Sequence, residues 1–529
     1  MQRTRLAVTL TLALLMALTA ASIASAAVPT DTSALREAVT VEGILEHERS
    51  FQEIADANGG TRASGTPGYD ASAAYVAERL REAGYEVTLQ PFTFPFFQEL
   101  EPTTFAQTAP SEKTYQNGED FAIMEYSGSG TVTDTPVVPT SDVQIPPGAE
   151  ANSSTSGCEA SDFPAETDGS VALIQRGTCS FAQKAQNAEA AGAVAAIIFN
   201  EGQEGRTEVL NGTLGGPGVS IPVIGTTFAV GEELYSAPGA RVSISASTLS
   251  EERQTSNVIA ETPTGRSDRV TFVGAHLDSV PEGPGINDNG SGSAAILEVA
   301  EEISELNIKP RNKVRFAFWG AEESGLLGAE HYVSGLSKSE RKNIAVYLNF
   351  DMVGSPNYVR FVYDGDGSDT PQSGPNGSAQ IERVFNAYFA SQGLATDPTA
   401  FDGRSDYGPF IAVGIPAGGL FTGAEGIKTE EQASVYGGVA GLAYDPCYHQ
   451  PCDSMTPVED GANADDYEAL EAEYDLAGNL NTRALDEMSD AIAHATLTFA
   501  QTTSAVNGTA KGNGTPTSSF EFKGAHRQR

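Results

Sequence analysis

The chain has 529 residues, of which 40% are hydrophobic, which is enough for a large core and for two or three domains. Its formal net charge is −39 at pH 7. A surface this negative excludes nucleic-acid binding, which needs cations that replace phosphate counterions, and it excludes binding to anionic membranes. We therefore expect a soluble, secreted and monomeric protein.

The first residues predict a targeting segment. The basic start MQRTR precedes the apolar stretch LAVTLTLALLMALTAASIA and the small residues ASAA. This order is typical of a secretory signal peptide, here residues 1–26, cleaved after Ala26. A retained membrane anchor is the alternative, although no other apolar run is long enough to span a bilayer.

Four cysteines form two local pairs, Cys158 with Cys179 and Cys447 with Cys452. Neither pair has the CxxC spacing of thiol redox sites. In a secreted chain this spacing favours two small-loop disulfides over a zinc cluster.

The remaining chain predicts a large α/β domain interrupted by an insertion. Residues 27–105 show helical apolar spacing and then a strand, whereas residues 106–250 are rich in Pro, Gly, Ser and Thr and contain short strands. Residues 251–500 alternate apolar strands with helices, which indicates a mixed, mostly parallel sheet flanked by helices. Residues 501–529 are poor in apolar residues and predict a disordered tail.

Polar residues follow three of these strands in the C-terminal half. RVTFVGA runs into His276, VRFAFWGA into Glu322 and Glu323, and AVYLNF into Asp351. In α/β sheets ligands gather beyond the carboxyl ends of the strands, so we expect these side chains at one rim. Two further candidates are Asp288, in the loop before a helix, and His449, in CYHQPC.

So many carboxylates at one rim would repel one another and be poorly solvated. Divalent cations remove both problems, and a mixture of imidazole and carboxylate donors favours zinc over magnesium or calcium. Glu322, adjacent to a metal ligand, is suited to proton transfer. A carboxylate at Asp278 is suited to accept the free N–H of His276, and Tyr448 is suited to donate its hydroxyl to a developing oxyanion.

The motifs GAHLDSV…GINDNGSG, FWGAEESGLLGAEHYV, LNFDMVG, GRSDYGPF and CYHQPCDS together resemble the secreted two-zinc aminopeptidases of the bacterial leucine aminopeptidase and aminopeptidase Y type. The resemblance implies that His276 and Asp351 hold one zinc ion. It implies that Glu323 and His449 hold the other, and that Asp288, followed by a cis peptide bond, bridges the two. Glu322 would then be the general base.

The same resemblance implies roles at the edges of the site. Arg404 would lie at the substrate pocket. Relatives place a glutamate near the substrate amine, whereas this chain has DPTAFDG, so Asp397 or Asp402 would substitute. Asp486 and Asp490, at helical spacing, would hold a calcium ion.

The insertion GSVALIQRGTCSFAQKAQNAEAAGAVAAIIFN resembles the protease-associated domain. Taken together, the sequence predicts a secreted zinc aminopeptidase that acts on peptides with a free N-terminus and prefers large apolar N-terminal residues. A carboxypeptidase, a glutaminyl cyclase on the same fold and a non-catalytic binding module are the alternatives.

Overall fold

The computed structural model describes residues 30–507, so the expected signal peptide lies outside the described residues. Residues 501–507 were expected to begin a tail, but they end in helix α14 (Ser504–Asn507), which buries Val506. Within residues 30–507, no helix combines the length and the apolar composition that a membrane crossing needs.

A mixed sheet organises the C-terminal half. Its parallel centre has the order β14-β11-β9-β10. These strands are β9 (Arg266–His276), β10 (Asn312–Trp319), β11 (Ile344–Phe350) and β14 (Ala417–Phe421). Outer strands are β12 (Phe361–Tyr363), β13 (Asp397–Thr399), β8 (Arg241–Glu261) and β1 (Glu86–Ala109). Because β12 pairs antiparallel to β14, and β8 pairs antiparallel to both β10 and β1, the sheet is mixed and its centre parallel, as the sequence predicts.

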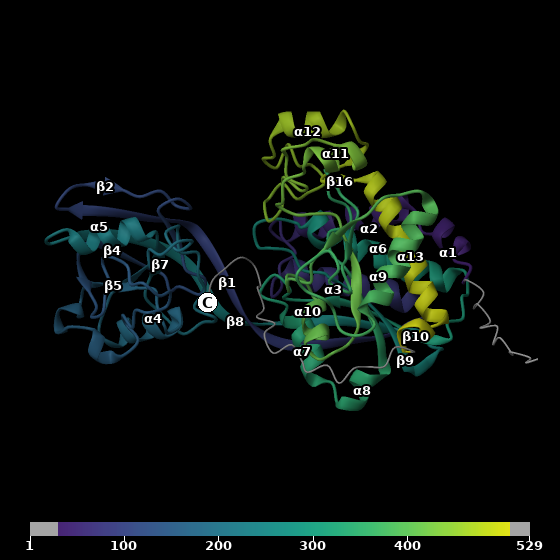
Figure 1. The fold of residues 1–529 in the computed structure, drawn as a ribbon, viewed down its shortest axis with the longest axis horizontal. Coiled ribbons are helices and arrows are strands. Elements are labelled where there is room, and N and C mark those ends of the chain that lie inside the picture. The colour runs from purple at the N-terminus through teal and green to yellow at the C-terminus, as the bar shows by residue number, and fades with distance from the viewer. Residues whose placement is uncertain (1–29, 508–529) are drawn as a thin grey trace, which may run out of the picture. The chain divides into compact units, whose positions relative to one another are not determined.

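Helices cover this sheet (Figure 1). They are α1 (Ser33–Ala38), α2 (Val41–Ala57), α3 (Pro67–Glu82), α6 (Gly292–Glu305), α7 (Leu327–Gly335), α8 (Lys338–Asn343), α9 (Ser378–Gln392), α10 (Tyr407–Ala412) and α13 (Thr482–Gln501). The short helices α11 (Glu430–Tyr436) and α12 (Ala464–Glu471) lie at the top of the view in Figure 1, beyond the sheet. A π-helical turn, η3 (Ile286–Ser291), precedes α6, and the short strands β15 (Leu476–Ala477) and β16 (Leu480–Asn481) precede α13.

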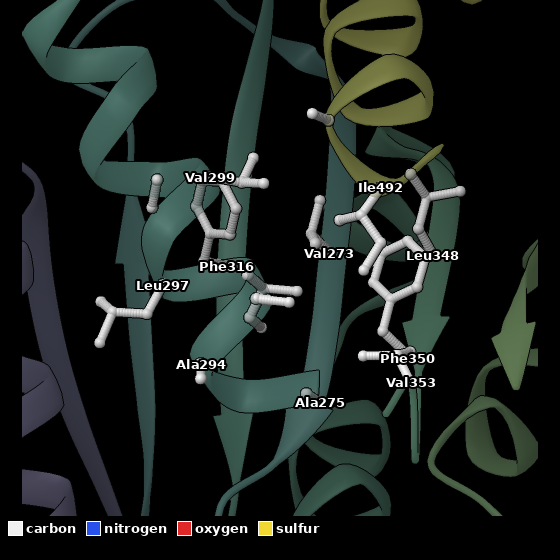
Figure 2. Close-up of a cluster of buried hydrophobic side chains, with 14 of the residues drawn as sticks. Val273, Ala275, Ala294, Leu297, Val299, Phe316, Leu348, Phe350, Val353 and Ile492 are labelled. Atoms are coloured by element: carbon white, nitrogen blue, oxygen red, sulfur yellow. The ribbon is translucent and has the colours of Figure 1, made fainter. Parts of the chain in front are cut away.

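The central strands are apolar throughout because both faces are buried. Val273 and Leu348 pack with Leu297 of α6 and Ile492 of α13 on one face (Figure 2). On the other face, Phe272 packs against the helices α7 and α10 as part of a second cluster. Alternate residues of one strand thus enter two cores, which fixes the strand register and the position of its carboxyl end.

The inserted region is carried on a long antiparallel ribbon of β1 and β8, which pair from Glu86↔Glu261 to Ala109↔Arg241. It adds β2 (Lys113–Thr114), β3 (Phe121–Ile123), β4 (Gly130–Pro139), β5 (Val171–Gln175), β6 (Ala195–Phe199) and β7 (Val223–Thr226). Its helices are α4 (Phe181–Ala190) and α5 (Phe228–Ser236), with 3-10 turns η1 (Ala160–Asp162) and η2 (Ala165–Thr167). The expected boundaries at 105/106 and 250/251 therefore fall inside two continuous strands.

Both expected disulfides are present, Cys158–Cys179 and Cys447–Cys452. One expected helix is shorter than its sequence pattern. Helical spacing predicts a start at Glu322, but α7 begins at Leu327, because Gly325 and Leu326 have φ of 109° and 65° and break the helix. The two glutamates consequently lie on the turn between β10 and α7.

Candidate metal centre and active site

Asp288 lies between two histidines. Its Oδ1 is 3.2 Å from Nε2 of His276, and its Oδ2 is 3.3 Å from Nε2 of His449. Each oxygen of one carboxylate therefore faces a different imidazole. This is the arrangement that a carboxylate bridging two cations requires.

Each histidine has a second carboxylate beside it. Asp351 Oδ1 is 3.2 Å from Nε2 of His276, and Glu323 Oε2 is 3.1 Å from Nε2 of His449. These five side chains and Glu322 all line one cavity of about 70 Å³. The structure thus brings together all five residues that the sequence predicts as zinc ligands.

The fold delivers these residues from separate elements. His276 is the last residue of β9, Asp351 follows β11, and Asp288 lies in η3, followed by a cis peptide bond to Asn289. Non-glycine residues beside the ligands adopt the left-handed region, with φ of 52° at Ala321 and at Met352. His449 itself has φ of 57°. Such conformations cost about 1–3 kcal/mol each and cluster at functional sites.

The electrostatics of the cluster suit bound cations. Burial and neighbouring negative charge raise the pKa of Glu323 to about 7, although His449 opposes the shift. Burial opposes protonation of His276, yet the carboxylates of Glu322 and Asp351 hold its pKa well above its ordinary value. The buried Oε1 of Glu323 has no hydrogen-bond partner. A nitrogen and oxygen donor set with excess negative charge and an unpaired carboxylate oxygen fits zinc.

Glu322 sits at the edge of the cluster. Its Oε2 is 3.9 Å from Nε2 of His276, and its main-chain N–H donates to Oδ1 of Asp278 at 3.2 Å. Burial raises its pKa well above the ordinary value, with His276 opposing. The carboxylate is therefore close to the ligands without lying between the two histidines.

The side chain of Asp278 does not bond His276 as expected. Its Oδ1 is 3.7 Å from Nδ1, whereas its main-chain carbonyl oxygen is 3.0 Å from that nitrogen. A main-chain carbonyl fixes the imidazole orientation equally well. The Asp278 carboxylate instead holds the main chain of Glu322.

The sequence did not single out Ser405 and Asn349. The Ser405 hydroxyl donates to Oδ2 of Asp351 at 2.5 Å and accepts from the Asn349 amide at 2.8 Å. Asp351 therefore presents only its other oxygen to His276. GRSDYGPF contains Ser405, but nothing in that motif identifies its partner.

Arg62 and Asp453 were also missed, and both hold the loop that carries Asp288. Arg62 is fully buried and donates to the carbonyls of Leu277, Pro284 and Gly285. Asp453 accepts from the main-chain N–H groups of residues 287 and 288 at 2.8 and 2.9 Å. A buried guanidinium and a buried carboxylate thus set the path of a loop that has few apolar side chains of its own.

Arg404 lies at the same cavity beside Tyr448. It donates to both oxygens of Glu425 at 2.9 and 3.2 Å and to the Tyr448 hydroxyl oxygen at 3.3 Å. Burial and the charges of Asp288 and Glu323 raise the pKa of Tyr448 well above its ordinary value. Tyr448 therefore keeps its proton. The bond from Arg404 uses a lone pair of the hydroxyl oxygen and does not involve that proton.

The two aspartates considered for the substrate amine differ. Asp402 is exposed and lines the cavity. Asp397 lies on β13, where it accepts from Gln432 and Tyr436. Only Asp402 is thus placed to meet a ligand in this cavity.

At the expected calcium site, an arginine side chain pairs with one of the two aspartates. Oδ2 of Asp490 accepts from Arg36 at 3.2 Å and from the Tyr388 hydroxyl at 2.9 Å. The guanidinium supplies the positive charge beside Asp490. The geometry gives no support to calcium at Asp486 and Asp490.

A mixed α/β sheet with a histidine–carboxylate centre at the carboxyl ends of its strands is the arrangement expected of a metal-dependent enzyme. Residues 257–475 match peptidase family M28, and residues 134–234 match the PA domain. An aminopeptidase of Pseudomonas aeruginosa (strain PAO1) is 49% identical over 430 residues, covering 81% of this chain and 79% of its own. The chain belongs to peptidase family M28 and is a hydrolase of peptide bonds.

A further relative and two solved structures are also aminopeptidases by name. A probable lipoprotein aminopeptidase of Mycobacterium tuberculosis is 44% identical over 80% of this chain and 82% of its own. The zinc aminopeptidase of Bacillus subtilis superposes with a TM-score of 0.53 at 25% identity, covering 86% of this chain and 94% of that one. An aminopeptidase from Aneurinibacillus gives 0.60 at 24% identity over 88% and 95%, a likeness of fold. The family inferred from the motifs is confirmed.

Proposed function

We propose that the protein is a secreted aminopeptidase that uses two zinc ions to remove N-terminal, preferably large apolar, residues from peptides. The observation that carries the proposal is the carboxylate of Asp288, whose two oxygens face two different histidines. The names of the relatives support the aminopeptidase activity. The two disulfides support secretion, because such bonds persist in oxidising compartments.

The five ligands divide naturally into two sets. His276 and Asp351 would hold one ion, His449 and Glu323 the other, and Asp288 both. When bound, zinc supplies Lewis-acid activation of water and of the scissile carbonyl. Ser405 keeps Asp351 oriented, and Asp453 keeps the Asp288 loop in place.

Glu322 transfers the proton. Its carboxylate takes a proton from the attacking water and gives it to the nitrogen of the leaving peptide. The raised pKa supports this role, because burial makes the carboxylate of Glu322 a stronger proton acceptor than an exposed glutamate. The Asp278 bond to its main chain fixes the direction from which it acts.

The cavity supports the substrate preference. Tyr363, Phe421 and Met352 line it and offer apolar contact to the side chain of the first residue. Asp402, exposed at the same cavity, supplies a negative charge for the free α-amino group. A peptide without that amine loses this ion pair.

Replacing Tyr448 with Phe should lower kcat about 100- to 1000-fold, since its hydroxyl donates to the oxyanion that develops only in the transition state. KM for a leucyl anilide should change less than threefold or so, because the ring and its stacking on His449 are retained. Steady-state kinetics measure both constants. A change confined to KM would assign the hydroxyl to ground-state binding instead.

The activity itself is tested with a leucyl anilide and its N-acetyl form, each with and without a chelator. We expect hydrolysis of the free amine only, its loss on metal removal and its return with zinc. Equal hydrolysis of the acetylated substrate would contradict the aminopeptidase proposal. Cleavage restricted to a C-terminal residue would indicate a carboxypeptidase, and cyclisation of an N-terminal glutamine without release of an amino acid would indicate a glutaminyl cyclase.

A further inference from the structure

A second histidine–carboxylate cluster lies outside the active site. It joins His47 of α2 to Glu298 and Glu301 of α6. Nε2 of His47 is 3.5 Å from Oε2 of Glu298 and 3.9 Å from Oε2 of Glu301. The His47 side chain is 1% exposed and that of Glu298 is 9% exposed. These atoms lie within 4.8 Å of one another, as ligands of a single metal ion would.

The ring of His47 is held in one orientation. Its Nδ1 is 2.8 Å from the Tyr75 hydroxyl, while its buried Nε2 has no hydrogen-bond partner. A histidine that binds a metal through one nitrogen is commonly fixed by a bond at the other. With the proton on Nδ1, the lone pair of Nε2 is directed at two carboxylates, a repulsive arrangement that a cation reverses.

The two helices approach closely at this point. A Cβ atom at Gly43, one turn before His47, would lie 1.9 Å from Oε1 and 2.7 Å from Oε2 of Glu298. The Glu298 carboxylate therefore rests against the bare backbone of α2. Any larger residue at position 43 would displace the carboxylate from the cluster.

Negative charge exceeds positive charge around the cluster. Arg79 bonds both oxygens of Glu301, at 2.7 and 2.5 Å, but within residues 30–507 the ion pair of Glu298 is with His47. A divalent cation would offset the excess.

We propose that His47, Glu298 and Glu301 bind a further Zn²⁺ ion that cross-links α2 to α6. The donor set of one imidazole and two carboxylates suits zinc, and water completes the coordination. Since α6 directly follows the η3 turn that carries Asp288, the ion anchors the helix behind the active-site loop. It takes no part in peptide hydrolysis, and the inference does not depend on the proposed function.

The test counts zinc in the full-length protein after dialysis against a zinc buffer, by mass spectrometry of the metal. His47→Gln and Glu298→Gln should each bind one zinc ion fewer per chain than the wild type. His331→Gln is the matched control, because His331 is exposed and its ring stacks on Phe92 rather than contacting these carboxylates. It should bind as much zinc as the wild type, and so should the inactive variant Glu322→Gln.

Diffraction from wild-type crystals at the zinc absorption edge gives an answer that does not require either variant to fold. An anomalous peak beside Nε2 of His47 is the expected result. Crystals with zinc in the active site and no peak at His47 would overturn the inference, as would an unchanged zinc count in a folded His47→Gln protein. Loss of peptidase activity in Glu322→Gln bears only on the proposed function.

Discussion

Replacing Glu322 with Gln should lower kcat for a leucyl anilide by about 100- to 10,000-fold while the protein keeps its zinc, because general acid–base catalysis contributes rate factors of this size. Glutamine preserves the size of the side chain but neither accepts nor returns a proton. Glu322 lies outside the His276–Asp351 and His449–Glu323 sets, so metal binding should survive. Steady-state kinetics and zinc analysis of the same preparation measure both properties.

The matched control is Glu330→Gln, an exposed glutamate on α7. It carries the same change of charge and should leave kcat unchanged. If Glu322→Gln loses zinc together with activity, Glu322 is a ligand rather than the base. If kcat is unaffected, proton transfer belongs to another group.

Replacing Asp288 with Asn should weaken the binding of both zinc ions, because its two oxygens face the two histidines separately. The amide offers one neutral oxygen in place of two anionic ones. Because the bound metal contributes several kcal/mol of charge stabilisation in the transition state, losing it should lower kcat of Asp288→Asn by roughly a thousandfold or more. Zinc titration and kinetics measure the two effects, and we expect both ions to be lost over the same range of chelator concentration.

Glu323→Gln provides the contrast, since Glu323 faces His449 alone. It should weaken one ion much more than the other and give a two-step loss of zinc. Asp168→Asn, at an exposed aspartate of the inserted region, is the charge control. Two-step release from Asp288→Asn, with one ion at its original affinity, would mean that Asp288 serves a single metal.

The gathering of three candidate metal ligands at one rim was predictable because it depends on where strands end. His276 ends an apolar strand, Glu323 and Asp351 each come after one, and the parallel pairing of β10, β9 and β11 brings the ends of these strands to one rim. The local spacing of the cysteines likewise predicted both disulfides. Both features depend on short stretches of sequence, so they can be predicted without knowledge of the fold.

The residues that hold the candidate ligands in place were not predictable, because their hydrogen-bond partners are determined by tertiary packing. Arg62 is distant in sequence from the carbonyls of Leu277 and Gly285, and Ser405 from Asp351. Arg404 pairs with Glu425 rather than with the nearby Asp406, which is fully buried. The same limit explains Asp278, whose main chain rather than side chain bonds the histidine.

Anomalous diffraction at the zinc edge tests the account most directly, because it locates the ions relative to Asp288. We expect two peaks in the active site, one beside His276 and Asp351 and the other beside His449 and Glu323, each in contact with a different oxygen of Asp288. A single peak in a zinc-saturated, active crystal, or two peaks of which only one contacts Asp288, would contradict the account.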